Sequence, residues 1–123
     1  MNIKDKLILV TGGANGIGRA LCERSAKEGA KKIVVADLDF ENAQAVAGEI
    51  DGKAIRLDVS DEAQVKAAVE EVLNEFGEID LVCSNAGIAG AAGSLEVSND
   101  VWQKFTKSMF CRICIWRGRF FLR

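Results

Sequence analysis

The chain has 123 residues, 49% of them hydrophobic, which suffices for one globular domain and leaves no room for a second. Its net charge of −2 is unevenly spread: residues 1–100 carry 10 basic and 18 acidic side chains, whereas residues 101–123 carry 6 basic and no acidic ones. No apolar run reaches the roughly 18 residues of a membrane-spanning helix, and no signal-peptide pattern precedes the first apolar run. We therefore expect a soluble, cytoplasmic protein without a membrane partner.

Four cysteines bear on the redox and metal chemistry of the chain. Cys22 and Cys83 fall in helix-like and strand-like segments, and Cys111 and Cys114 lie near the carboxyl end. This is not the loop framework of a disulfide-rich domain, so we expect reduced thiols. Cys111 and Cys114 have the spacing of a metal or redox pair. Without a second such pair or any histidine, we expect no metal site.

The first predicted element is a strand over residues 7–10, whose consecutive apolar residues favour burial on both faces. It leads into the turn Thr11-Gly12-Gly13-Ala14-Asn15-Gly16-Ile17-Gly18. Three spaced glycines let this turn bend sharply and approach a ligand without a Cβ in the way: Gly12, Gly16 and Gly18. A helix is predicted from Ile17 to the C′ residue Gly29, so its first N–H groups and positive dipole end face the turn. This arrangement predicts a phosphate-binding turn.

A second strand is predicted over residues 32–37, where an apolar run ends in Asp37. Two parallel strands joined by a helix cross over right-handed, which brings both carboxyl ends to one edge beside the glycine turn. Asp37 lies 19 residues after Gly18, close to the spacing of about 20 at which an acid accepts hydrogen bonds from an adenosine ribose. The unit therefore predicts a bound cofactor that contains adenosine.

The next unit repeats this alternation of helix and strand. We predict a helix over residues 40–50, a strand over 54–57 that ends at Asp58-Val59, and then a helix capped by Ser60 or Asp61. Apolar residues of this third helix recur at i, i+3, i+4, i+7, i+8 and i+11, and Gly77 follows them: Val65, Ala68, Val69, Val72, Leu73 and Phe76. One face of the third helix is therefore expected to be buried.

A fourth strand is predicted over residues 79–84, followed by Asn85-Ala86-Gly87 and a fourth helix over residues 97–107. Strands that alternate with helices indicate an α/β fold with a doubly wound parallel sheet, in the order 3-2-1-4. In that order the fourth strand is apolar enough for burial on both sides, yet it forms an edge. Because an apolar edge pairs readily with other chains, we expect a homo-oligomer or an aggregation-prone chain.

The residues alone leave some alternatives open. A missing Gly-Lys-Ser/Thr ending excludes the phosphate-binding loop of nucleoside triphosphatases, but a methyltransferase would also pair a glycine turn with an acid after the second strand. Asp58 has a purely structural interpretation as a turn cap, and Asn85 has one as a bridge between strands through backbone hydrogen bonds.

Four motifs in register resemble the short-chain dehydrogenase/reductase family. They are the Thr-Gly-x-x-x-Gly-x-Gly turn at 11–18, Asp37, Asp58-Val59 and Asn85-Ala86-Gly87, and the resemblance covers about residues 3–107. It implies a Rossmann-like fold that is incomplete in this chain, with NAD as the cofactor. It also implies the activity of that family, which is hydride transfer that oxidises secondary alcohols or reduces ketones.

The resemblance also implies which residues contact NAD. The pyrophosphate and the adenosine side would be lined by Gly12, Asn15, Gly16, Ile17 and Gly18. The adenine ribose would meet Asp37 and Leu38, the adenine would meet Asp58 and Val59, and the nicotinamide ribose would meet Asn85, Ala86 and Gly87.

The resemblance ends where the chemistry of the family begins. That chemistry uses a Ser and a Tyr-x-x-x-Lys, and this chain contains no tyrosine and no histidine. The family places a catalytic Asn in the fourth helix, usually in a Val-Asn pair, where this chain reads Ser108-Met109-Phe110. We therefore expect no catalytic residues here. A non-catalytic NAD-binding or interaction module and a non-functional truncation product are the alternatives.

The composition changes near residue 108, which divides the chain into an NAD-binding Rossmann domain (1–108) and a divergent basic-aromatic tail (109–123). The tail holds four arginines, four aromatic residues and no acid. We interpret it as the result of a changed reading frame or splice pattern. It shows no clean amphipathic or basic-patch pattern, so we expect no membrane or nucleic-acid partner. The expected partners are NAD(H) and, only in a full-length form, a small alcohol or ketone substrate.

Overall fold

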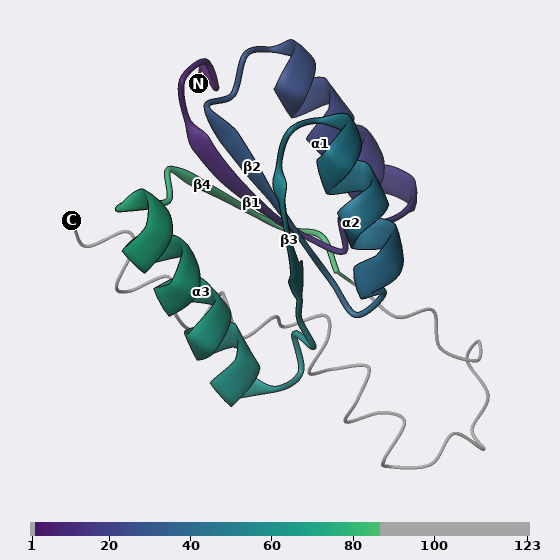
Figure 1. The fold of residues 1–123 in the computed structure, drawn as a ribbon, viewed down its shortest axis with the longest axis vertical. Coiled ribbons are helices and arrows are strands. Elements are labelled where there is room, and N and C mark those ends of the chain that lie inside the picture. The colour runs from purple at the N-terminus through teal and green to yellow at the C-terminus, as the bar shows by residue number, and fades with distance from the viewer. Residues whose placement is uncertain (1, 87–123) are drawn as a thin grey trace, which may run out of the picture.

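The computed structural model describes residues 2–86, which form a four-stranded sheet with three helices in its connections (Figure 1). Strands and helices alternate as the sequence predicts: β1 (Leu7–Thr11), α1 (Gly16–Lys27), β2 (Lys32–Asp37), α2 (Phe40–Glu49), β3 (Lys53–Arg56), α3 (Glu62–Phe76) and β4 (Leu81–Ser84). Gly87, the helix predicted at 97–107 and the segment 109–123 lie outside the described residues.

All paired strands run parallel, in the predicted order β3-β2-β1-β4. β1 is central, because Ile8 pairs with Ile33 of β2 on one side and with Leu81 of β4 on the other. Since every strand has the same direction, the four carboxyl ends meet at one edge of the sheet. We call this edge, which includes the segments that directly follow the strands, the carboxyl edge; its strands end at Thr11, Asp37, Arg56 and Ser84.

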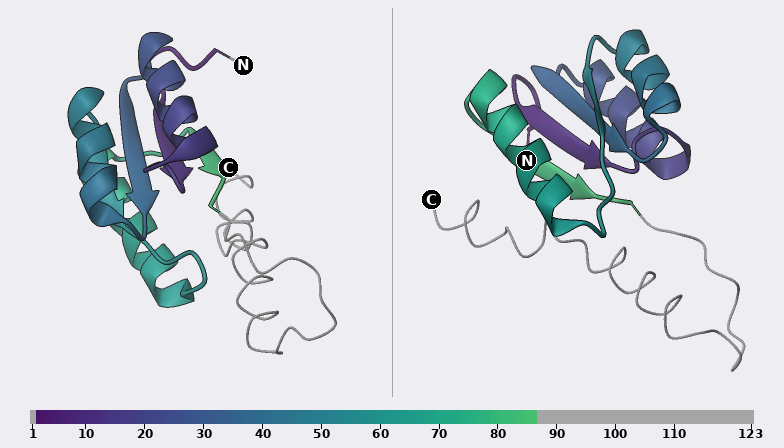
Figure 2. Two further views of the ribbon diagram at one scale, coloured as in Figure 1. Left: turned by 90° about the vertical axis from the view of Figure 1, so that its right-hand side faces the viewer. Right: turned by 60° about the horizontal axis from the view of Figure 1, so that its bottom comes forward.

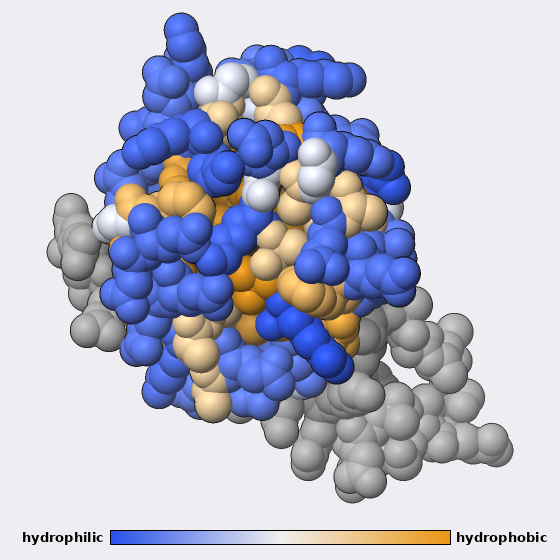
Figure 3. Space-filling view, in the orientation of Figure 1, coloured by the Kyte–Doolittle hydropathy of each residue, from blue (hydrophilic) through white to orange (hydrophobic). Residues whose placement is uncertain are grey.

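Helices cover both faces of the sheet, with α1 and α2 on one face and α3 on the other (Figures 1 and 2). Side chains of β1 alternate between the two faces. Leu7 and Leu9 belong to the apolar cluster under α3, and Ile8 and Val10 belong to the cluster under α1 and α2. All four are buried, which confirms the prediction and stabilises the fold by about 1.5–3 kcal/mol for each large side chain. Hydrophobic residues also reach the surface in a band between these layers, on an otherwise hydrophilic face (Figure 3).

The predicted apolar face of α3 packs on the sheet. Its residues Val65, Ala68, Val69 and Val72 are buried, and Leu73 and Phe76 pack against them partly buried. Of the two predicted caps, Asp61 is the N-cap: its Oδ1 accepts hydrogen bonds from the N–H groups of Ala63 (3.0 Å) and Gln64 (3.3 Å). No helix within residues 2–86 is long and apolar enough to cross a membrane.

Two glycines end helices in the left-handed conformation, as predicted. Gly29 has φ of +85°, its N–H donates to Ala26, and the N–H of Ala30 donates to Ser25, which is the Schellman arrangement. Gly77 has φ of +83° and donates to Leu73 at the end of α3. Both positions favour glycine because a Cβ strains this backbone conformation.

The structure corrects several predicted boundaries by one or two residues. β4 begins at Leu81, not at residue 79, because Asp80 is used differently: its Oδ2 accepts from the N–H of Leu7 at 2.7 Å and its N–H donates to the Leu7 carbonyl. β3 lies one residue earlier than predicted, since Lys53 already pairs with Val34. α1 begins at Gly16, one residue earlier than predicted.

β4 lies at the edge of the described sheet. Within residues 2–86 it pairs with β1 only, and its side chains at Leu81, Val82 and Cys83 are partly exposed. The predicted strand order thus places an apolar strand at an edge, with one side of its backbone unpaired in the described part of the chain.

A hydroxyl group joins the carboxyl ends of β1 and β4. The Oγ1 atom of Thr11, which is fully buried, accepts hydrogen bonds from the N–H groups of Asn85 and Ala86, both at 3.1 Å, and donates to the Cys83 carbonyl at 3.4 Å. The side-chain amide of Asn85 donates back to the carbonyls of Thr11 and Gly12, both at 3.3 Å. These bonds satisfy backbone groups at the ends of both strands and just beyond them.

Removal of the Thr11 hydroxyl should therefore destabilise the sheet. We expect Thr11→Val to lower the free energy of unfolding by about 1–3 kcal/mol, because two N–H groups lose a shared acceptor while the side-chain volume is retained. Thr11→Ser keeps the acceptor and should cost less, and urea unfolding followed by circular dichroism measures both. A valine variant as stable as the unaltered chain would contradict this role of the hydroxyl.

Candidate functional site

The predicted site residues that the structure describes gather along the carboxyl edge. The glycine turn follows β1, and its Gly12 packs so closely on the segment after β4 that an added Cβ would lie 2.9 Å from the Cα of Ala86. The N–H of Leu57 donates to the carbonyl of Asp37 at 3.0 Å, which places Asp58 beside the end of β2. Four segments far apart in the sequence thus form one candidate site.

Two glycines of the turn are required by packing. Gly12 has φ of +67°, and both Ala86 and Asn85 crowd the position of its missing Cβ. A Cβ on Gly18 would overlap the carbonyl of Gly12 and lie 2.6 Å from the Asn85 side-chain nitrogen. Because these neighbours are mostly backbone atoms, they cannot move aside by changing rotamer. Gly12 and Gly18 therefore bring α1, the turn and β4 into close contact.

Gly16 is different from these two glycines. Its φ is +58°, yet no atom lies within 4 Å of the position where its Cβ would be. The packing of the chain thus gives no reason for the missing side chain, and the backbone borders open space at the start of α1. Its positive φ favours glycine by itself, and the open space leaves room for a ligand beside the first N–H groups of α1.

The amino end of α1 also lacks the caps that the other two helices have. The side chains of Asp39 and Asp61 accept hydrogen bonds from first-turn N–H groups of α2 and α3, whereas Asn15, the N-cap of α1, makes no side-chain cap bond. α1 has no acidic residue in its first turn, and α2 and α3 each have one. The N–H groups and positive dipole end of α1 are therefore left for an anion.

Asp37 lies beside this turn and contacts it. Its Oδ2 accepts a hydrogen bond from the N–H of Ala14 at 3.1 Å, and its Oδ1 accepts one from the N–H of Asp39 at 3.0 Å. The sequence predicts a ribose contact at this position but not the bond to Ala14. The spacing between the glycine turn and Asp37 predicts that Asp37 lies at the carboxyl edge. It does not predict which groups its carboxylate binds.

Asp58 and Val59 have structural roles at the end of β3. The Oδ1 of Asp58 accepts from the N–H of Ser60 at 2.9 Å and from its hydroxyl at 2.6 Å, which is the turn cap of the structural interpretation. Val59 is only 8% exposed and belongs to the apolar cluster under α3. Asn85 likewise has the structural role of bridging β1 and β4. All three residues thus make structural contacts at the carboxyl edge.

Two large apolar side chains of the predicted site are exposed instead. Ile17 is 75% exposed on the first turn of α1, and Leu38 is 53% exposed directly after β2. They flank the glycine turn and Asp37. Exposed apolar groups beside polar ones are typical of sites where a ligand buries an apolar or aromatic part.

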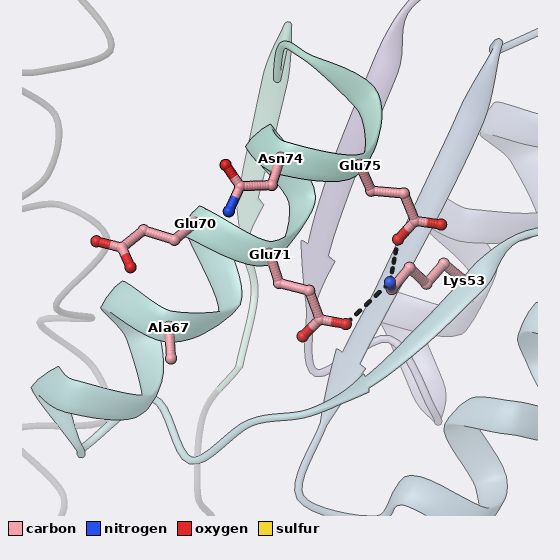
Figure 4. Close-up of a pocket in the computed structure, with 6 residues that line it drawn as sticks. All are labelled: Lys53, Ala67, Glu70, Glu71, Asn74 and Glu75. Atoms are coloured by element: carbon pink, nitrogen blue, oxygen red, sulfur yellow. Dashed lines mark hydrogen bonds and ion pairs between the residues drawn. The ribbon is translucent and has the colours of Figure 1, made fainter.

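A concave region lies on α3, away from the carboxyl edge (Figure 4). It is an open groove around Lys53, whose Nζ forms ion pairs with Glu75 and, at 2.9 Å, with Glu71. The bond to Glu75, and after it the bond to Glu71, raises the pKa of Lys53. Lys53 begins β3, so the groove is at the opposite end of that strand from Asp58. Partly exposed ion pairs of this kind contribute little to the free energy of unfolding. The groove is separate from the carboxyl edge and is not part of the candidate site.

The two described cysteines, Cys22 and Cys83, are free thiols in the structure. Cys22 is buried in α1, and burial raises its pKa to about 12, so it stays protonated near neutral pH. Burial also raises the pKa of Cys83. No group of histidine, cysteine or acidic side chains within residues 2–86 is arranged to hold a metal ion.

Comparison with known proteins identifies relatives of the chain. The family model described as short chain dehydrogenase matches residues 6–112. The chain is 44% identical over 104 residues to the oxidoreductase YuxG of Bacillus subtilis, which covers 79% of this chain and 15% of that protein. It is 38% identical to the sorbitol dehydrogenase of Cereibacter sphaeroides (85% of this chain, 41% of the relative). It is also 38% identical to the 3-oxoacyl-[acyl-carrier-protein] reductase of Escherichia coli (83% and 42%).

Solved structures agree with these relatives. The chain is similar to a 3-ketoacyl-(acyl-carrier-protein) reductase from Brucella melitensis complexed with NADH, with a TM-score of 0.86, 34% identity and coverage of 95% of this chain and 49% of that one. A short-chain type dehydrogenase/reductase from Mycobacterium marinum gives a TM-score of 0.78 at 32% identity, with 87% and 45% covered. The chain spans less than half the length of these proteins. With its matching family model, its sheet order and its glycine turn, the chain belongs to the short-chain dehydrogenase family.

Proposed function

We propose that this chain binds NAD(H) at its carboxyl edge, as the amino-terminal portion of a short-chain dehydrogenase. The observation that carries this proposal is the start of α1, where the N–H groups lack a side-chain cap and Gly16 borders open space. A pyrophosphate would satisfy these N–H groups and would interact favourably with the helix dipole. The NADH-bound relative from Brucella melitensis supports the same choice of cofactor.

The roles of individual residues follow from their places on this edge. The turn residues Gly12, Asn15, Gly16, Ile17 and Gly18 would hold the pyrophosphate. Asp37 and Leu38 would meet the adenine ribose, and Asp58 and Val59 the adenine. The nicotinamide ribose would meet the segment after β4, at Asn85, Ala86 and Gly87.

The activity proposed for the whole protein is oxidation of a secondary alcohol or reduction of a ketone, in which bound NAD(H) supplies the hydride acceptor or donor. Relatives named as sorbitol dehydrogenase and galactitol 2-dehydrogenase support an alcohol, and the acyl-carrier-protein reductase supports a ketone. The family's proton transfer requires a tyrosine, and these 123 residues contain none. The role proposed for this chain is therefore to bind and orient the cofactor.

A non-catalytic NAD-binding module is the second candidate, because every contact proposed at the carboxyl edge is with the cofactor. The two candidates differ in turnover. A chain that binds NAD but oxidises none of a panel of secondary alcohols, even in the context of a full-length protein, would be such a module.

Gly16→Val should abolish NAD binding and leave the fold largely intact. The branched side chain would occupy the space proposed for the pyrophosphate and would strain the positive φ. Gly77→Val is the matched control, because Gly77 also has a positive φ and open surroundings but lies at the end of α3. Calorimetric titration should show affinity lost only in the first variant, and unchanged affinity in Gly16→Val would mean that the turn is only structural.

NAD should bind at least about tenfold more tightly than NADP. A carboxylate at Asp37 accepts hydrogen bonds from ribose hydroxyls but repels a 2′-phosphate, by about 4 kcal/mol per unit charge at ~4 Å and an effective dielectric constant of ~20 before screening. Titration of the unaltered chain with each cofactor measures the ratio. Equal affinities would refute the proposed contact between Asp37 and the ribose.

The outer side of β4, which is unpaired within residues 2–86, supports an oligomeric or aggregation-prone chain. We expect light scattering after size exclusion to show species larger than a monomer, and NAD at about 100 times its Kd to stabilise the folded chain by about 2.7 kcal/mol. Ser84→Lys, which places a charge on the exposed end of β4, should shift the chain toward a monomer. A monodisperse monomer with a melting temperature that NAD does not change would contradict both expectations.

A further inference from the structure

Three successive N–H groups of the glycine turn are held by the end of β2. The N–H groups of Gly12 and Gly13 both point to the Ala36 carbonyl, at 2.8 and 3.4 Å. The next N–H, that of Ala14, donates to the Oδ2 atom of Asp37 at 3.1 Å. The backbone of β2 thus holds the first part of the turn, and a side chain extends this support by one residue.

The carboxylate that binds Ala14 is itself held in place. Its other oxygen, Oδ1, accepts from the N–H of Asp39 at 3.0 Å, and Asp39 is the N-cap of α2. One carboxylate group therefore connects the middle of the turn to the start of α2. With both oxygens bound to backbone N–H groups, the side chain has little freedom to rotate.

The Asp37 carboxylate can accept more hydrogen bonds than these two. Two ionised oxygens offer about four lone pairs, so two ribose hydroxyls can bind while both backbone bonds remain. Ala14 is 1% exposed, and its N–H therefore depends on this one acceptor, because water does not reach it. The Asp37 carboxylate would therefore bind the ribose of the cofactor and also hold the glycine turn that binds the cofactor's phosphates.

We propose that Asp37 is a positioning residue for the glycine turn in addition to its contact with the ribose. This inference rests on the proposed function for the ribose contact and on the observed hydrogen bonds for the turn. It follows that replacement of Asp37 by an apolar residue loosens the turn, and that removal of its charge alone does not. A variant that lacks the charge of Asp37 no longer repels the 2′-phosphate of NADP. It should bind NADP only if its side chain at position 37 still accepts the hydrogen bond from the N–H of Ala14.

The test compares Asp37→Ala with Asp37→Asn, which loses the charge and keeps one of the two acceptor oxygens. That oxygen can accept the N–H of Ala14, and the amide nitrogen then faces the N–H of Asp39. Asp39→Ala is the control, because it removes a carboxylate two residues away and leaves both backbone partners of Asp37 in place. Amide hydrogen exchange without cofactor reports on Ala14, and the amides of Leu9 and Val10 in buried β1 report on global unfolding. Calorimetric titration measures the affinity of each variant for NAD and for NADP.

We expect Asp37→Ala to speed exchange at Ala14, relative to the β1 amides, by about tenfold or more, as the loss of one charge-assisted hydrogen bond predicts. This variant should bind neither cofactor well. In Asp37→Asn and Asp39→Ala, exchange at Ala14 should stay within about threefold of the unaltered chain, and Asp37→Asn should bind NADP about as well as NAD.

Unchanged exchange at Ala14 in Asp37→Ala would overturn the proposal. So would a gain of NADP affinity in Asp37→Ala equal to that in Asp37→Asn, since charge alone would then set the preference. Faster exchange at Ala14 in a chain whose unaltered form binds no NAD would support the positioning role and refute the proposed function, so the two failures are distinguishable.

Discussion

The contact between Gly12 and Gly18 is the constraint on which the carboxyl edge depends. The chain leaves the central strand β1, turns, and begins α1 in such close quarters that neither residue has room for a Cβ. The atoms that would obstruct a side chain are mainly backbone atoms of the turn itself and of the segment after β4. Side-chain rearrangement therefore cannot relieve the crowding, and only glycine allows α1 to start directly above the end of β1. This closeness directs the first N–H groups of α1 toward the edge where β2 and β4 also end.

The polar side chains of this edge are first of all ligands of the backbone. Thr11, Asp37, Asp58 and Asn85 each form hydrogen bonds to main-chain groups that follow the ends of strands. A buried N–H without such a partner costs about 1–3 kcal/mol, so these bonds stabilise the irregular segments that a parallel sheet leaves at its carboxyl ends. They also fix the side chains in one orientation, which lowers the entropy cost of binding a ligand. The side chains that are proposed to contact the cofactor, Asp37, Asp58 and Asn85, therefore also hold the backbone of this edge.

The first turn of α1 stands apart from this pattern. α2 and α3 satisfy their first N–H groups with aspartate caps and carry an acid in their first turn, and α1 has neither. Ile17, on that same turn, exposes most of its side chain. An N-cap side chain normally stabilises a helix by about 1 kcal/mol, and α1 lacks this contribution. The exception is physically understandable when an anionic ligand provides the missing interaction.

The order of elements and the place of the site follow from the sequence by itself. Alternating apolar runs and amphipathic segments predict four parallel strands with helices between them. Right-handed crossovers are compatible with the order β3-β2-β1-β4, which is the order expected of a doubly wound sheet and the one that the structure has. Because parallel strands share a carboxyl edge, the glycine turn, Asp37, Asp58 and Asn85 had to meet there. The periodicity of α3 likewise identifies its buried face, and Gly29 and Gly77 mark helix ends through their left-handed conformation.

Only the tertiary structure decided which partner each polar group takes. Asp80 lies in an apolar run that reads as part of a strand, yet it binds the N–H of Leu7, which delays the start of β4. Asp37 binds Ala14, 23 residues away, and Asn85 binds Thr11 and Gly12 across the sheet. Patterns of hydropathy and spacing report on local backbone geometry and on the face of an element. Hydrogen bonds between distant segments depend on distances of a few tenths of an ångström, which arise only when the helices have packed on both faces of the sheet.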